Sequence, residues 1–141
     1  MASYFQTGST IGVDLNNPST TQLFGLNTKV LGSNDSEWQY CIATGTIGTG
    51  IFCSVNTAGT AVAITTAAIA AAATPMDIGV CQYTVASGSF FWLAKRGQLL
   101  QVACSGSLPV TVQLGINAGG VLGTALLGVS TMAGIFLESA A

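Results

Sequence analysis

Residues 77–115 read DIGVCQYTVASGSFFWLAKRGQLLQVACSGSLPVTVQLG, and this stretch decides the fold. Apolar, β-branched and aromatic runs lie end to end in it, interrupted at Ser87-Gly88, Arg96-Gly97 and Ser105-Gly106-Ser107. Glycine and serine between such runs are typical of strands joined by tight turns. The stretch holds one of the two tryptophans and two of the three cations. We therefore expect three or four consecutive strands here, without catalytic machinery.

Further short strands are predicted on both sides of this stretch. Trp38, Tyr40 and Ile42 alternate with other residues, which indicates a strand with one aromatic face. Additional strands are expected at residues 51–55, 60–65, 121–127 and 135–138. The alanine-rich run at residues 66–74 is expected to form a short helix or an irregular crossover before Pro75. Eight to ten strands at spacings of about ten residues indicate a small antiparallel, jelly-roll-like β-sandwich or barrel.

The first 28 residues differ in character from the rest. They are rich in threonine, asparagine and glutamine, and they show neither a helical stripe nor sustained alternation. Isolated apolar anchors interrupt them, among which Tyr4, Phe5, Leu23 and Phe24 are candidates for contact with a partner. We expect an extended N-terminal arm (residues 1–28) before a β-domain (residues 29–141). Such an arm can order across a neighbouring subunit, and a merely loose N-terminus is the open alternative.

The scarcity of charge limits the possible environments of the chain. Only 6% of its 141 residues are charged, against about 25% in an ordinary soluble domain. Much of the surface is therefore expected to be covered by partners or by lipid. Residues 118–137 carry no charge and are long enough to span a membrane, but five glycines and the absence of flanking basic residues disfavour a span. No secretory signal is recognisable at the N-terminus.

The inventory of reactive residues argues against an enzyme. The chain has no histidine, which excludes Ser-His-Asp and Cys-His nucleophile schemes. The acids are scattered, and the one close pair, Asp35 and Glu37, is expected to form a solvated edge. Cys41, Cys53, Cys81 and Cys104 are too widely spaced for a zinc motif and are expected to be reduced, partly buried thiols; a disulfide is the open alternative. No cofactor motif is found.

Lys95 and Arg96 form the only basic cluster. The cluster is too small for nucleic-acid binding, which a net charge of −2 also opposes. These two cations either protect the end of a strand before the Gly97 turn or bind an acidic patch on a partner.

Several segments resemble the decoration, or cement, proteins that stabilise the heads of tailed bacteriophages. The resemblance covers most of residues 30–137 and consists of seven segments. They are the strand SEWQYCIA and its following turn, a hairpin, an Ala/Thr-rich connection, the run DIGV, an aromatic strand with a basic-glycine turn, and a last strand. These segments lie at residues 36–43, 45–47, 56–61, 66–74, 77–80, 90–97 and 102–104.

The resemblance implies a non-enzymatic virion protein on the capsid exterior, assembled in the host cytoplasm. Its partners would be the major capsid protein and further copies of itself, as a homotrimer or alternatively a homodimer. No nucleic acid, membrane or cofactor is expected to bind. The alternatives are another virion surface component, such as a fibre base or a carbohydrate-binding β-sandwich, and a small membrane lysis protein. Exposed Trp or Tyr in a shallow groove would favour carbohydrate binding.

Overall fold

The computed structural model describes residues 9–10, 13–33, 35–64, 77–97, 100–104, 114–117 and 120–124. Every regular element among these residues is a β-strand, so the all-β prediction is confirmed. None of the described residues belongs to a helix that could cross a membrane. The predicted helix or crossover at residues 66–74 and the predicted strand at residues 135–138 lie outside the described residues.

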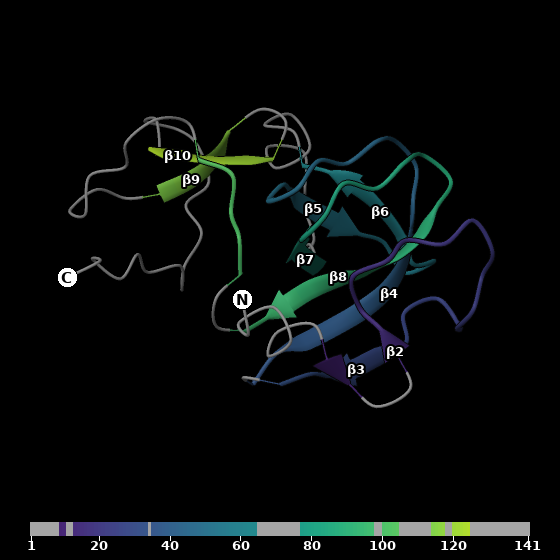
Figure 1. Cartoon of the computed structure of the whole chain (residues 1–141). Coiled ribbons are helices and arrows are strands. Elements are labelled where there is room, and N and C mark those ends of the chain that lie inside the picture. The colour runs from purple at the N-terminus through teal and green to yellow at the C-terminus, as the bar shows by residue number, and fades with distance from the viewer. Residues whose placement is uncertain are drawn as a thin grey trace.

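Six strands form the main sheet, and five of them close into a barrel (Figure 1). The strands are β3 (Lys29–Leu31), β4 (Glu37–Ala43), β5 (Phe52–Val55), β6 (Thr60–Ala63), β7 (Asp77–Val80) and β8 (Phe90–Arg96). Their order is β3-β4-β6-β5-β7-β8, and β8 also pairs with β4. The barrel therefore consists of β4, β6, β5, β7 and β8. Strand β3 is an extra strand beside the first half of β4.

The sheet is mixed rather than wholly antiparallel. Strands β4 and β6 are parallel through the pairs Ile42↔Thr60 and Ala43↔Ala61, whereas every other pairing among the described strands is antiparallel. The parallel contact arises because β5 and β6 form a hairpin whose second strand, not its first, lies against β4. Two short hairpins accompany the barrel: β1 (Ser9–Thr10) with β2 (Val13–Asp14), and β9 (Leu114–Asn117) with β10 (Val121–Thr124).

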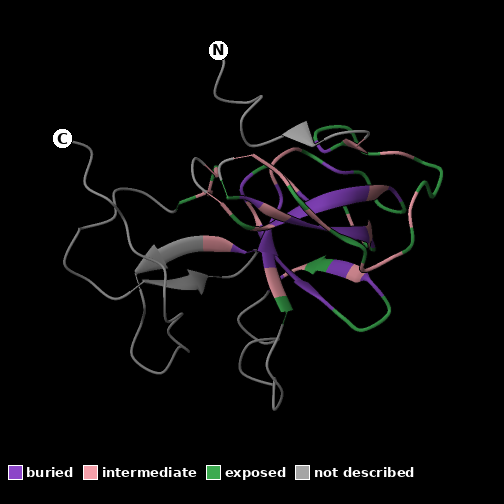
Figure 2. Ribbon diagram, turned by 90° about the horizontal axis from the view of Figure 1, so that it is seen from below, coloured by how far each residue is buried: buried purple, intermediate pink, exposed green. Residues whose placement is uncertain are grey.

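The pairing of β4 with β8 separates two apolar clusters. Inside the barrel, buried small and branched side chains pack around Phe91 and Leu93; they include Cys41, Ala43, Ile47, Cys53, Val55, Ala61, Cys81 and Val85. On the outer face of the same two strands, Trp38, Tyr40 and Trp92 pack with Leu15 and Ala94. Successive residues of a strand point to opposite faces, so the aromatic alternation of β4 and β8 supplies both clusters. Figure 2 shows buried residues along the strands of the main sheet.

Residues 13–28, the described part of the predicted arm, lie on the outer face of their own chain's barrel. Ser19 exchanges two backbone hydrogen bonds of 2.8 Å with Phe90, and the Asn27 amide donates to the Tyr40 carbonyl at 2.8 Å. Asn27 has φ 67, a left-handed conformation that asparagine tolerates. Its side-chain amide donates to the Thr57 carbonyl at 2.8 Å. Leu15 is fully buried, so this segment covers apolar surface that would otherwise face water.

Strands β7 and β8 approach each other closely where they close the barrel. The two strands pair only at Val80↔Ala94, and a side chain on Gly79 would come within 2.7 Å of the Ala94 carbonyl oxygen and of Leu93. Beyond this pair, the Tyr83 hydroxyl accepts a hydrogen bond from the Trp92 amide at 3.1 Å and donates to the Trp92 carbonyl at 3.2 Å. Tyr83 thus satisfies backbone groups that β7 does not reach.

Gly79→Ala should destabilise the protein by about 1–3 kcal/mol, because the added methyl group must push β7 away from β8. Gly45→Ala is the matched control: nothing lies within 4 Å of a methyl group at that position, and its effect should stay within about 0.5 kcal/mol. Urea unfolding followed by tryptophan fluorescence measures both. Equal losses for the two variants would contradict the close approach of β7 to β8.

Tyr83→Phe should cost about 1–3 kcal/mol of unfolding free energy, because the Trp92 amide and carbonyl lose their shared partner while the ring volume stays almost constant. Thr84→Val removes a neighbouring exposed hydroxyl and should change stability by less than about 0.5 kcal/mol. Hydrogen exchange at the Trp92 amide provides a local measure. An exchange rate at this amide that the Phe variant leaves unchanged would show that the hydroxyl is not its partner.

Candidate functional site: an aromatic pocket beside Asp14

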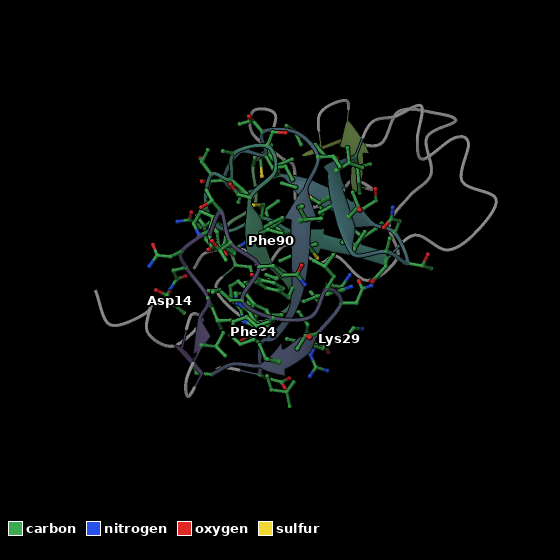
Figure 3. The ribbon with its side chains drawn as sticks, turned by 90° about the vertical axis from the view of Figure 1, so that its right-hand side faces the viewer. Asp14, Phe24, Lys29 and Phe90 are labelled. Carbon is green, nitrogen blue, oxygen red and sulfur yellow. The ribbon has the colours of Figure 1, made fainter. Side chains whose placement is uncertain are left out.

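A pocket of about 340 Å³ lies where residues 14–24 pass over the outer face of β4 and β8. Its floor and walls are aromatic, and its remaining lining is a mixture of apolar and polar side chains. The aromatic members are Phe24, Tyr40, Phe90 and Trp92; the others are Asp14, Asn17, Pro18, Ser19 and Leu23. Figure 3 shows Phe24 and Phe90 near the middle of this face and Asp14 toward one edge.

The four rings pack against one another as a continuous wall. The centroids of Tyr40 and Trp92 are 4.9 Å apart, and Phe24 lies 5.3 Å from each of them. Phe90 stacks almost parallel to Tyr40, with an interplanar angle of 12° and a centroid distance of 6.1 Å. Tyr40 and Trp92 are only 2% exposed, whereas Phe24 and Phe90 are partly exposed. A ligand in the pocket would therefore contact mainly the two phenylalanine rings.

Hydrogen bonds fix the lining in place. The Tyr40 hydroxyl accepts a hydrogen bond from the Leu23 amide at 3.1 Å, and the backbone pairing of Ser19 with Phe90 holds the opposite wall. At the rim, the Asp14 carboxylate accepts two hydrogen bonds, one from the backbone amide of Asn16 at 3.0 Å and one from the side-chain amide of Asn17 at 2.5 Å. The pocket is thus preformed by contacts within the chain, which lowers the entropic cost of binding.

The structure brings together two of the predicted partner-binding residues. Leu23, 66% exposed, and the partly buried Phe24 both line the pocket. Tyr4 and Phe5 lie outside the described residues. Lys95 and Arg96 lie at the far end of β8 from Phe90, about 20 Å away at the usual rise of an extended strand.

The basic residues are engaged within the chain. Lys95 forms an ion pair with Asp77, and its side chain is only 9% exposed. The exposed Arg96 guanidinium lies 3.2 Å from the Asp35 carboxylate. The Lys29 ammonium lies 3.6 Å from Glu37. Asp35 and Glu37, two positions apart in the sequence, therefore pair with two different cations and do not form a carboxylate pair.

The cysteines do not form a reactive centre. Cys41, Cys53 and Cys81 are buried free thiols inside the barrel, and Cys104 is exposed. Burial raises the pKa of Cys41 to about 12 and that of Cys81 to about 11, and it raises the pKa of Cys53 further still. Thiols with raised pKa values are poor nucleophiles at neutral pH. No group of three or more His, Cys, Asp or Glu side chains among the described residues could hold a metal ion.

The buried thiols should make the protein sensitive to alkali. Above pH 9.0, the ordinary pKa of a thiol, each of these cysteines is ionised in the unfolded chain but still protonated in the folded protein. Ionisation therefore stabilises the unfolded state, so the free energy of unfolding is unaffected below this pH and falls as the pH rises above it. The unfolding free energy should fall by about 1 kcal/mol per buried thiol between about pH 8 and pH 10. Urea unfolding at the two pH values measures this loss.

Two variants assign the effect to the barrel interior. Cys81→Ala should reduce the loss by about one third, since it removes one of three buried thiols. Cys104→Ala removes the exposed thiol and should leave the loss unchanged. Stability that is independent of pH over this range would contradict the burial of the three thiols.

The sequence alone does not predict that Asp14, Tyr40, Phe90 and Trp92 belong to one site. The alternation of aromatic residues indicates a buried face but not which segment covers it. Asp14 and Phe90 are distant in the sequence, and they line one pocket only because Ser19 pairs with Phe90. The sole local signal is the Asp-Leu-Asn-Asn-Pro run at residues 14–18, whose turn-forming residues hold the carboxylate at the rim.

Comparison of the chain with protein-family models, with curated proteins and with solved structures found no match.

Proposed function

We propose that this chain is a structural protein of a tailed bacteriophage that binds the outer surface of the assembled capsid and stabilises contacts between major capsid subunits. The observation that carries the proposal is the surface of the barrel. Its three Lys and Arg residues are all paired with acids of the same chain, while large apolar side chains are exposed at Leu23, Leu31 and Val62. A surface with so little free charge is suited to being covered by a partner.

A further feature supports the proposal. Four of the segments that resemble phage decoration proteins coincide with β4, with the turn between β5 and β6, and with β7 and β8. A small barrel can bind repeatedly over a lattice, and repetition adds avidity to individually modest contacts.

A carbohydrate-binding virion component is the second candidate, because the aromatic pocket is a concave site with polar groups at its rim. Tyr40 and Trp92 are, however, almost completely buried beneath residues 19–24. They therefore do not offer the open Trp or Tyr face on which a sugar ring would stack, and we favour capsid binding.

Capsids that lack this protein provide the test. Purified protein should co-sediment with such capsids, saturate at a fixed number of copies, and raise the temperature at which the particles release DNA. We propose that the free protein is a trimer, with a dimer as the alternative. Light scattering measures this oligomeric state before the protein is added to capsids. Protein that folds normally but fails to add to deficient capsids would refute the proposed function.

Leu31→Lys should weaken capsid binding by about tenfold or more, because it places a charge on an exposed apolar side chain of the edge strand β3. Leu31 is 68% exposed, so folding should be unaffected. Ala86→Lys adds the same charge at an exposed turn position and is the control. Equal binding by the two variants would exclude β3 from the interface.

A further inference from the structure

The pocket carries an unbalanced negative charge. Of the five acids, Asp35, Glu37 and Asp77 are each paired with one of the three Lys and Arg residues. Glu138 lies outside the described residues. Asp14 is thus the one described carboxylate without a Lys or Arg partner, and it stands at the rim of the aromatic pocket. Because each of the chain's own Lys and Arg side chains is engaged elsewhere, a cationic side chain that neutralises Asp14 would come from another protein.

The Asp14 carboxylate is oriented but not saturated. One oxygen accepts a hydrogen bond from the Asn16 amide and the other from the Asn17 side chain. A carboxylate offers about four acceptor positions, so each oxygen retains capacity for a further donor. Asp14 is exposed, which leaves both oxygens accessible. Two parallel hydrogen bonds from a guanidinium group match this arrangement.

The aromatic wall favours a flat cation over a compact one. The faces of aromatic rings attract positive charge. In this wall the rings contact one another at 4.9–6.1 Å between centroids, so they form a surface rather than a cage that could enclose an ammonium group. A guanidinium group is planar and weakly hydrated, and it stacks on such a surface. The volume of about 340 Å³ is near the lower limit of ligand pockets and suits a single side chain.

We propose that this pocket binds an arginine side chain of a partner protein, with the guanidinium group between the Asp14 carboxylate and the exposed rings of Phe24 and Phe90. The identification of the partner as a capsid subunit rests on the proposed function. The binding of an arginine side chain rests on the chemistry of the pocket alone, so arginine binding and capsid binding are tested separately.

The pocket is tested with a minimal probe, Nα-acetyl-argininamide, in a titration followed by ¹H–¹⁵N NMR. The amides of Asn16, Asn17 and Phe90 should shift and saturate in the millimolar range expected for one side chain. The citrulline analogue has nearly the same shape without the charge and should bind at least about tenfold more weakly. The lysine analogue should bind with intermediate affinity because it cannot stack.

Two variants with the same change in net charge locate the binding. Asp14→Asn should reduce arginine affinity at least about tenfold. Asp35→Asn removes an exposed carboxylate that pairs with Arg96 and should leave the affinity unchanged. Absence of shifts, equal binding of arginine and citrulline analogues, or equal losses in the two variants would overturn the inference. Saturating shifts at the same amides with a neutral monosaccharide, but not with arginine, would replace it with a sugar site.

The same two variants connect the pocket to capsid binding. Asp14→Asn should lower affinity for deficient capsids at least about tenfold relative to Asp35→Asn. If the arginine probe binds while both variants bind capsids equally, the assignment of the capsid as the arginine donor is wrong. If the probe fails to bind while wild-type protein still adds to capsids, the pocket inference is wrong and the proposed function stands.

Discussion

The structure depends on the pairing of β4 with β8. These are the two longest described strands, and they form six residue pairs from Glu37↔Arg96 to Ile42↔Phe90, with a register shift between Glu37 and Trp38. Side chains from alternate positions fill the barrel on one side and form the aromatic wall on the other. Both faces of the pair are buried, although strands of a small antiparallel sheet commonly have one face in water. The requirement to cover the second face explains why residues 13–28 lie across it.

This covering segment unites the fold with the site. Residues that have no regular structure over most of their length are held at Ser19, Leu23 and Asn27 by bonds to β8 and β4. In this position the segment adds Asp14, Asn17 and Pro18 to a pocket lining that would otherwise be mainly aromatic. The pocket therefore exists because the cover is incomplete: Leu15 seals one part of the wall, and Phe24 and Phe90 remain partly exposed in another.

The sequence was sufficient to predict the strands with strong local signals. The aromatic alternation of β4, the apolar run of β5 and the aromatic run of β8 each correspond to a described strand. The parallel contact of β4 with β6 was not predictable, because strand direction depends on which strand of a hairpin docks and not on composition. The site was still less predictable. Asp14 is one of five scattered acids in the sequence, and only the three ion pairs elsewhere distinguish it from the others.

The register of β4 with β8 also constrains how the chain can fold during synthesis. Trp38 pairs with Ala94, 56 positions later in the chain (94 − 38), and no other described strand pairs with that edge of β4. A nascent chain therefore cannot complete its barrel until Phe90–Arg96 has left the ribosome. Such distant pairing pays its loop-closure entropy before it gains contacts, which is typical of slowly folding β-proteins. Until then Trp38 and Tyr40 would lie against water or against a chaperone.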